Sequence, residues 1–385
     1  MSSTVFTNIG ELTTNGSEGV LHDAALVVEG ERVLWIGPSA SAPAADERVD
    51  VDGRAMLPGW VDSHTHLAFA GDRSAEFAAR MAGEAYAAGG IKVSVERTRA
   101  ASSSELRVLM AERVRSANLG GTTWLETKTG YGLDVETEVR SARLAAEITE
   151  DVTFLGAHVV PDGWDADDYV ALVTGAMLDA VRPHVAWMDV FCERGAFDEA
   201  QSRTVLEAGA DAGLGLRVHG NQLGHGPGVR LAVELGAASV DHCNFLDDAD
   251  VERLGTSSTV ATLLPACDLS TRQPFPPARR LIDAGATLAL ASNCNPGTSY
   301  TTSMAFCVAT AVLQMQMTVE EAVWSATMGG ARALRRHEGE LPIGALAPGF
   351  RADLQVLDAP SVTHLAYRPG MHLTQAVWLA GERVT

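Results

Sequence analysis

Short apolar runs alternate with longer amphipathic segments from residue 58 onward. The eight runs are GWVDS (59–63), TTWLET (122–127), VTFLGAH (152–158), VAWMDVF (185–191), GLRVH (215–219), SVDH (239–242), TVATLL (259–264) and TLALAS (287–292). Most are apolar throughout rather than alternating, as expected of strands that are covered on both faces. Eight strand–helix units predict a (β/α)8 barrel, an α/β fold in which the active site lies at the C-terminal ends of the strands.

The segments between the runs carry helix signals. Residues 73–88 and 104–121 have helical patterns, and Gly120 is expected to stop the second helix as its C′ residue. Asp134 is expected to cap the helix that precedes the third run. An open, doubly wound sheet is the alternative architecture for such an alternation.

The two ends of the chain show a different pattern. Residues 24–37 and 376–385 each read as strand, glycine-containing turn and strand, and both contain the string Gly-Glu-Arg-Val. We predict that residues 1–57 and 345–385 pair in a small β-sandwich domain, and that residues 58–344 form the barrel.

Composition narrows the class of protein. The hydrophobic content of 46% is that of a globular chain, and a formal net charge of −20 argues against nucleic acid or an anionic membrane as a partner. The five cysteines form no C-x-x-C pair, which favours a reducing compartment and no cysteine zinc knuckle. The N-terminus lacks the features of a secretion signal, and no apolar run is long enough to span a bilayer. We therefore expect a cytoplasmic protein.

Polar side chains gather where the predicted strands end. They are His64 and His66, Glu126 and Lys128, His158, Glu193, His219, His242 and Asn293, and they include five of the eleven histidines. The barrel brings these strand ends to one face, whereas an open sheet gives no reason for histidines to end so many strands.

A metal site is the most specific chemistry in this set. His64 and His66 are two residues apart in an extended strand, so both imidazoles point to the same side and can reach one ion. His219 offers a third nitrogen ligand from another strand. Three such ligands with an open position suit a hydrolytic metal that activates water. Paired surface histidines and a buried structural histidine are the alternatives for the pair and for His219.

Several longer segments resemble the amidohydrolase superfamily and, within it, the imidazolonepropionase family. They include LPGWVDSHTHLAFAGDRSAEFAARM, ETKTGYGLDVETE, FLGAH, MDVFCERGAF, VDHCNF, ATLLPACDLSTRQPFPPARRLIDAGATLALAS and IGALAPGFRADL. The resemblance covers nearly the whole chain, and the FAGDR, KTGYG and NPG strings are its most specific parts. It implies one zinc or iron ion that activates water to open the ring of 4-imidazolone-5-propanoate, giving N-formimidoyl-L-glutamate in histidine degradation.

The resemblance also implies roles for single residues. His64, His66 and His219 would bind the metal ion, and Arg73 would pair with the propanoate carboxylate, for which a guanidinium fork is the right group. The remaining implied substrate contacts are Tyr131, His158, Asn295, Gly297 and Thr298. His242 would hydrogen-bond the developing oxyanion or the attacking water. From the residues alone, Arg73 could instead form a surface salt bridge with Glu76, Tyr131 could lie in a surface turn, and His242 could be a buried histidine bonded to backbone.

Lys128 is expected to support the structure rather than to bind metal. Some superfamily members bridge two metal ions with a carboxylated lysine at the end of the fourth strand, and this chain has no lysine there. A single-metal site is the better interpretation.

Two positions depart from the family pattern. Gln222 stands where many members have glutamate, so it can hydrogen-bond a substrate but cannot accept a proton. Asn293 stands where the family has the aspartate that binds the metal and takes the proton from water. An amide oxygen is a neutral, poorer ligand and has no usable basicity, whereas a general base contributes about 10²–10⁴ in rate.

Three interpretations of Asn293 follow. The change inactivates the enzyme, whether natural or introduced; or His242 moves the proton instead; or the chain acts on another cyclic amide or only binds a ligand. We favour the first. Among functions, the leading hypothesis is a metal-dependent cyclic amide hydrolase with a carboxylate-bearing substrate, and we expect a homodimer. The alternatives are a hydrolase or deaminase of another heterocycle, and an inactive ligand-binding relative.

Overall fold

The computed structural model describes residues 2–83 and 90–385. Its contacts divide the chain into two units, one of Met1–Asp62, Arg115–Trp124 and Ser303–Thr385, the other of Ser63–Val114 and Leu125–Thr302. The division between Val114 and Arg115 falls inside helix α3 (Ser103–Leu119), so residues of this helix belong to both units. Each unit is described by itself.

The first unit contains the sheet predicted from the chain ends. Its strands are β1 (Ser3–Thr13), β2 (Val20–Glu29), β3 (Arg32–Pro38), β4 (Glu47–Asp50), β5 (Ala55–Pro58), β15 (Leu354–Leu357), β16 (Thr374–Leu379) and β17 (Glu382–Arg383). They form one eight-stranded sheet in the order β17-β16-β15-β5-β1-β2-β3, with β4 paired to β1. Strands from both ends of the chain therefore pair, as predicted.

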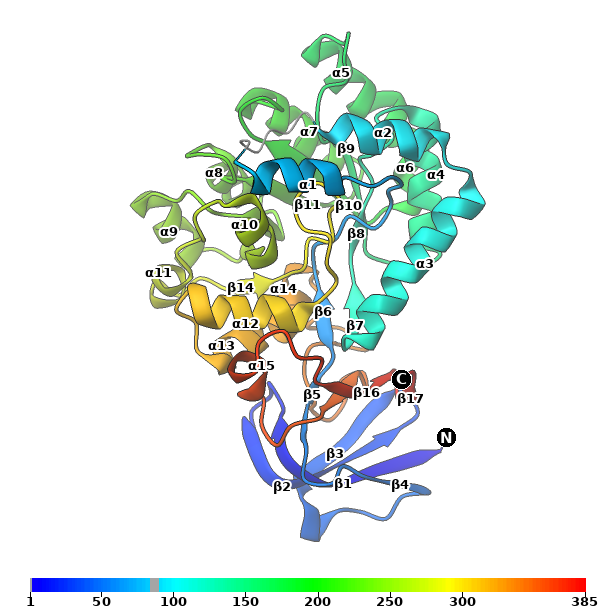
Figure 1. Ribbon diagram of the computed structural model, residues 1–385, viewed down its shortest axis with the longest axis vertical. Coiled ribbons are helices and arrows are strands. Elements are labelled where there is room, and N and C mark those ends of the chain that lie inside the picture. Colours follow the sequence, from blue (N-terminus) through cyan, green and yellow to red (C-terminus); the bar gives the residue numbers. More distant parts are fainter. Residues whose placement is uncertain (1, 84–89) are drawn as a thin grey trace. The chain divides into compact units, whose positions relative to one another are not determined.

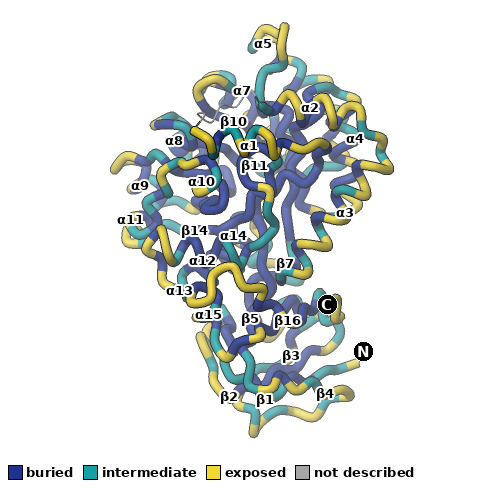
Figure 2. The backbone as a smooth tube through the Cα atoms, in the orientation of Figure 1, coloured by how far each residue is buried: buried dark blue, intermediate teal, exposed yellow. Residues whose placement is uncertain are grey.

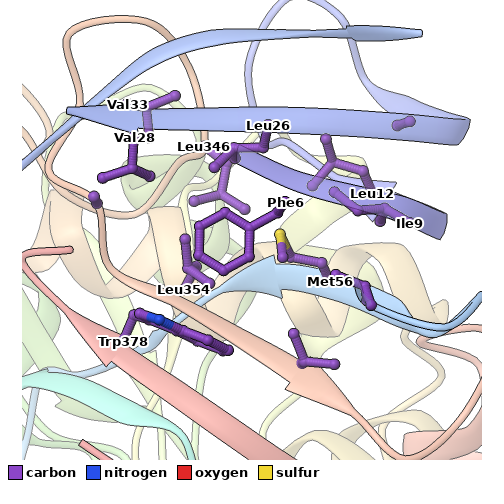
Figure 3. Close-up of a cluster of buried hydrophobic side chains, with 14 of the residues drawn as sticks. Phe6, Ile9, Leu12, Leu26, Val28, Val33, Met56, Leu346, Leu354 and Trp378 are labelled. Carbon is purple, nitrogen blue, oxygen red and sulfur yellow. The ribbon is translucent and has the colours of Figure 1, made fainter. Parts of the chain in front are cut away.

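A shared apolar core explains why this sheet folds over on itself. Figure 3 shows Phe6 and Leu26 facing Met56, Leu354 and Trp378 from the other strands. The rings of Phe6 and Trp378 meet edge to face at 5.0 Å. The two faces enclose the core as in a sandwich, although the strands are continuous in one sheet. The domain boundaries proposed from the sequence, 1–57 with 345–385 and 58–344, remain a proposal.

The rest of the first unit is a two-stranded sheet and a group of helices. Strands β6 (Trp60–Asp62) and β7 (Thr122–Leu125) pair with each other. The helices are α12 (Met304–Gln314), α13 (Val319–Trp324), α14 (Gly330–Ala333) and α15 (His364–Tyr367), with a π-helical turn at Ser325–Gly329 and a 3-10 turn at Ser39–Ser41. A capping box between Thr318 and Glu321 begins α13.

The second unit contains the parallel barrel strands. They are β8 (Thr127–Lys128), β9 (Val152–Ala157), β10 (Trp187–Cys192), β11 (Gly215–Gly220), β12 (Ser239–His242), β13 (Val260–Leu263) and β14 (Leu288–Leu290), hydrogen-bonded in chain order. Thr65 closes the ring, because it forms a parallel bridge with Asn293 and accepts a hydrogen bond from the Lys128 amide at 2.9 Å. The predicted (β/α)8 fold is confirmed, and each predicted strand is present within a few residues.

Helices follow the strands of this unit and surround them (Figure 1). They are α1 (Ser74–Met81), α2 (Ile91–Ala100), α4 (Val135–Ala146), α5 (Ala166–Leu172), α6 (Leu178–Val181), α7 (Glu199–Asp211), α8 (Gly228–Glu234), α9 (Asp248–Gly255), α10 (Pro265–Thr271) and α11 (Ala278–Asp283), with a π-helical turn at Val173–Met177 and a 3-10 turn at Arg182–His184. In Figure 2 the barrel strands are buried and the outer helix faces are exposed, which explains their continuous apolar sequences.

Local signals in the sequence account for several boundaries. Asp134 caps α4 by accepting a 2.8 Å hydrogen bond from the Thr137 amide, as predicted. The second predicted strand is divided into β7 and β8 at Glu126, whose side chain is fully buried. After α3 the left-handed residue is Gly121 rather than Gly120. The predicted helix over 73–88 begins as α1, and its residues 84–88 lie outside the described residues.

Candidate active site

Three imidazoles meet at the C-terminal ends of the strands of the second unit. Nε2 of His66 lies 3.3 Å from Nε2 of His64 and 3.5 Å from Nε2 of His219. Two nitrogens bound to one tetrahedral ion at about 2.0–2.1 Å lie about 3.4 Å apart. All three side chains are buried. The His64–His66 and His66–His219 separations therefore fit nitrogen ligands on one divalent ion, and a ring nitrogen of His242 also lies within 4.8 Å of ring nitrogens of His64 and His219.

Two aspartates orient these rings from beneath. Asp241 Oδ2 lies 2.7 Å from Nδ1 of His64, and Asp189 Oδ1 lies 3.1 Å from Nδ1 of His219. A carboxylate at Nδ1 fixes the proton there and leaves the Nε2 lone pair free for a metal ion. Burial and the nearby Lys128 charge keep the pKa of His64 well below its ordinary value, so this imidazole is neutral, as a ligand must be.

A buried ionic layer holds the two aspartates. Lys128 Nζ lies 2.8 Å from Glu126 Oε1 and 3.0 Å from Asp189 Oδ2, and Arg217 Nη2 lies 3.3 Å from Asp241 Oδ2. Burial acts to raise the pKa of Asp241, but the charges of Arg217 and Lys128 outweigh it and hold that pKa below its ordinary value. A carboxylated Lys128 would add a further negative charge among these carboxylates. The structural role expected of Lys128 therefore agrees with its position.

Glu126 connects this layer to the histidine pair. Its Oε2 accepts a 3.0 Å hydrogen bond from the amide of Thr65, and its backbone carbonyl accepts one from the Thr65 hydroxyl at 2.6 Å. Since Thr65 lies between His64 and His66, these bonds fix the strand that presents both imidazoles.

One pocket collects nearly all of the residues singled out from the sequence. Its lining comprises His66, Arg73, Ile91, Tyr131, His158, Val159, Phe191, His219, Gln222, His242, Asn293, Asn295 and Thr298. Of the predicted site residues, only His64 and Gly297 are outside this lining. Three lining residues that the sequence did not indicate, Ile91, Val159 and Phe191, are apolar and carry no chemical signal.

The backbone turns sharply where three of these strands end. Asn221, His242 and Asn293 have positive φ angles of 56°, 85° and 70°. Such angles are uncommon outside glycine and gather at functional sites. The side chains of His242 and Asn293 line the pocket, whereas the Asn221 amide donates to the carbonyl of Phe245.

Asn293 presents its amide oxygen without a partner. Its Nδ2 donates a 2.7 Å hydrogen bond to Oγ1 of Thr298, whereas Oδ1 is buried and has no hydrogen-bond partner among the described residues. The side chain can therefore offer a neutral oxygen to a metal ion, and Thr298 is the residue that orients it.

Arg73 lies in the pocket wall and also forms a salt bridge. Its Nε and Nη2 each donate a 2.8 Å hydrogen bond to the carboxylate of Glu76. A side chain at Gly297 would overlap the Arg73 guanidinium, so a larger residue there would displace Arg73. Arg80 holds the same loop by donating from Nη1 to the Gly297 carbonyl at 3.0 Å. Arg73 therefore forms the ion pair with Glu76, but its side chain is only 5% exposed, so this is not a surface salt bridge, and the same side chain lines the pocket.

Glu138 supports the loop that carries Tyr131. Its carboxylate accepts backbone hydrogen bonds from Gly130, Gly132 and Leu133 at 2.9, 2.7 and 2.9 Å, and the side chain is buried. Gly130 has φ +104°, which suits a glycine. Tyr131 is buried with its ring 5.4 Å from that of His158, so it is not a surface turn residue.

We predict that Glu138→Gln raises KM roughly tenfold, because one backbone N–H would then face an amide NH2 and a hydrogen bond to a charged group contributes about 1.5–3 kcal/mol. Glu136→Gln, an exposed change on the same helix, serves as the control. Steady-state kinetics of both variants check this. An unchanged KM in Glu138→Gln would show that the loop carrying Tyr131 does not contribute to substrate binding.

Three further polar side chains complete the pocket. His158 Nδ1 lies 3.0 Å from the Gly130 carbonyl, and burial lowers the pKa of His158 to about 4, so its ring is neutral. The Gln222 amide Nε2 lies 3.9 Å from Sγ of Cys267, and Glu193 accepts the backbone N–H of Gln222. The ring of His242 lies 5.5 Å from that of His219.

Curated relatives identify the family. The chain is 68% identical over 386 residues to an imidazolonepropionase of Saccharopolyspora erythraea, and the match covers 100% of both chains. It is 65% identical to one from Arthrobacter sp. (strain FB24), with 99% of each chain covered. The chain belongs to the imidazolonepropionase family. Residues 195–384 also match the amidohydrolase family model, so this imidazolonepropionase family member is a hydrolytic enzyme of that superfamily.

Solved structures agree on the fold. An adenosine deaminase from Xanthomonas campestris with bound zinc matches with a TM-score of 0.71 at 19% identity, covering 99% of this chain and 92% of that one. An N-isopropylammelide isopropylaminohydrolase from Burkholderia multivorans matches with a TM-score of 0.74 at 20% identity, covering 100% and 98%. Within the described residues, no helix is long and apolar enough to cross a membrane.

The metal prediction can be tested directly. Protein purified without chelator is expected to contain up to one divalent ion per chain, and His219→Ala is expected to lose it, because the cluster would keep two imidazoles of the three. His225→Ala, which removes an exposed histidine, should leave the content unchanged. Elemental analysis measures this. Two ions per chain, or a carboxylated Lys128, would contradict a mononuclear site.

Proposed function

We propose that this enzyme hydrolyses 4-imidazolone-5-propanoate to N-formimidoyl-L-glutamate in histidine degradation, as a cytoplasmic homodimer with one zinc or iron ion per chain. One observation carries the proposal: a single pocket is lined by two imidazoles of the cluster, His66 and His219, and by Arg73, and Nε2 of His64 lies 3.3 Å from Nε2 of His66. A cyclic amide that bears a carboxylate needs both features at once.

Arg73 would bind the propanoate. Its Nε and Nη2 are engaged by Glu76, and its Nη1 lies beside Gly297. A substrate carboxylate can therefore pair with Nη1 while Glu76 keeps the guanidinium in place. Asn295 would complete this side of the pocket, because its Oδ1 accepts a 2.8 Å hydrogen bond from the Gly297 amide and so fixes the turn beside Arg73.

The ring would lie between Tyr131, His158 and Gln222. The rings of Tyr131 and His158 both contact the ring of His66. Their centroids lie 6.0 Å and 5.7 Å from the His66 centroid. The Gln222 amide can donate to a ring oxygen or accept from a ring N–H. These contacts would orient the ring carbonyl toward the imidazole cluster.

His64, His66 and His219, with the Asn293 oxygen, would hold the ion. When bound, such an ion supplies a water that is acidic enough to react at neutral pH and polarises a carbonyl. Water adds to the ring carbonyl carbon, the carbon–nitrogen bond of the cyclic amide breaks, and the departing nitrogen takes up a proton. His242 would donate a hydrogen bond to the oxygen that becomes negative.

Proton removal from water is the step that Asn293 limits. An amide cannot accept that proton, and the His242 ring, which also lines the pocket, would already donate to the developing oxyanion. We propose that the turnover of the enzyme is reduced for this reason.

An assay with 4-imidazolone-5-propanoate tests the function, with N-formimidoyl-L-glutamate identified by mass spectrometry. The panel includes the imidazolone without its propanoate and heterocyclic amines that would release ammonia. Ring opening of the propanoate compound, by the unmodified chain or by Asn293→Asp, is expected. Release of ammonia from a heterocyclic amine, with no ring opening by either protein, would overturn the proposal.

A further inference from the structure

Asp268 is a buried carboxyl group on α10 that the proposed reaction does not use. Its side chain is 1% exposed, and Oδ1 accepts a 2.7 Å hydrogen bond from Nδ2 of Asn244. The side-chain amide of Asn244 cannot be flipped to exchange its nitrogen and oxygen. The same Nδ2 donates to the carbonyl of Pro274 at 2.8 Å, and a carbonyl can only accept. Oδ1 of Asp268 is therefore the acceptor, and Oδ2 is the oxygen that remains.

Three buried polar atoms around this group have no hydrogen-bond partner within the described part of the chain. They are Oδ2 of Asp268, Oδ1 of Asn244 and Nδ1 of His242. A carboxylate oxygen of Asp268, a ring nitrogen of His242 and Sγ of Cys267 lie within 4.8 Å of one another. Buried polar atoms are seldom left without partners, and separations of this size are those that one water molecule bridges.

The surroundings of Asp268 favour its neutral form. Burial raises its pKa well above the ordinary value, and the Asn244 hydrogen bond only partly opposes this. No lysine or arginine forms an ion pair with Asp268 among the described residues. Since Oδ1 accepts from Asn244, the proton of the neutral acid is on Oδ2.

We propose that Asp268 is a positioning residue for His242: through one buried water, its Oδ2–H fixes the His242 ring with Nδ1 as acceptor and Nε2–H directed into the pocket. The water accepts from Asp268 and donates to Nδ1 of His242 and to Oδ1 of Asn244, so all three atoms gain partners. This inference rests on the role proposed above for His242, because a ring with Nε2–H is a donor for the developing oxyanion.

The backbone supports this arrangement. His242 and Cys243 have φ angles of +85° and +58°, and this turn brings Asn244 from the end of β12 to α10. The same two residues that end the strand therefore connect the pocket histidine to the neutral acid.

Two variants distinguish a role of Asp268 in positioning His242 from a merely structural role of Asp268. Asp268→Asn keeps an acceptor for Asn244 and an N–H donor in place of Oδ2–H, whereas Asp268→Ala removes both. We expect Asp268→Ala to lower kcat about 10- to 100-fold with little change in KM, as the loss of an orienting partner typically does, and Asp268→Asn to restore it to within a few-fold. Asp248→Ala, an exposed change on α9, is the control.

The ring itself gives a readout that needs no substrate. Nitrogen-15 spectra of histidine-labelled protein, with the His242 signals assigned by His242→Gln, report which ring nitrogen carries the proton. Nε2–H is expected in the natural sequence and in Asp268→Asn, and a shift toward Nδ1–H in Asp268→Ala. If the proposed substrate is wrong, this tautomer test still stands.

Two results would overturn the inference. One is equal loss of kcat in Asp268→Asn and Asp268→Ala with an unchanged His242 tautomer in both. The other is a loss of bound metal from Asp268→Ala, measured by elemental analysis, which would show that His242, Cys267 and Asp268 hold an ion of their own.

Discussion

Replacing Asn293 with aspartate is expected to raise kcat by about 10²–10⁴-fold, the usual contribution of a general base. The amide oxygen already points into the pocket without a partner, and the carboxylate would occupy the same place. Thr298, now the acceptor of the Asn293 amide, can turn its hydroxyl to donate instead. Metal affinity should also rise, because a neutral ligand becomes an anionic one beside a cation.

Steady-state kinetics of the two proteins at matched metal content measure the effect. KM should change little, because the substrate carboxylate would be bound by Arg73. If the unmodified chain is as active as Asn293→Asp, His242 or solvent removes the proton and the site is not impaired.

Arg73→Ala is expected to weaken substrate binding by about 2–5 kcal/mol, or about 30-fold to several thousand-fold, because the substrate carboxylate would lose its charged partner in a buried setting. The free energy of unfolding should change far less, because Glu76 is 30% exposed and can be solvated when its partner is removed.

The chain offers a matched control for this change. Arg107 forms the same bidentate pair with Glu147, at 2.7 and 2.8 Å, but on an exposed face of α3. Calorimetric titration of a substrate analogue into Arg73→Ala and Arg107→Ala separates ligand binding from the loss of an ion pair. Equal affinities in both variants would remove Arg73 from the site and reopen the possibility of a substrate without a carboxylate.

The barrel could be predicted because its strands are buried on both faces. The runs that became β9, β10, β13 and β14 are largely apolar rather than alternating, and that pattern needs no knowledge of tertiary contacts. His64 and His66 could be predicted as a pair for a similar reason, because residues two apart in a strand share a side. The prediction that His219 lies close to this pair rested only on the barrel, which places the C-terminal ends of all strands at one face.

The groups beneath and behind the pocket could not be predicted. Asp189 and Asp241 interrupt apolar strands, and a charge in a buried strand is a signal, but only the folded structure shows that each orients a histidine. Asp268 lies on a helix, where acidic residues are usually solvated, so the sequence gives no hint of its burial. The apolar side chains of the pocket wall, such as Phe191, are indistinguishable from core residues in the sequence.

The left-handed backbone at position 293 has an evolutionary consequence. Asparagine and aspartate are among the few residues that tolerate a positive φ, and they have the same shape, so an exchange between them leaves the fold undisturbed. Chaperones and proteases, which act on unfolded chains, would treat both proteins alike. Selection can therefore distinguish the two residues only through the fitness of a cell that must grow on the product, and a lineage could lose or regain catalysis here in a single step without passing through an unstable intermediate.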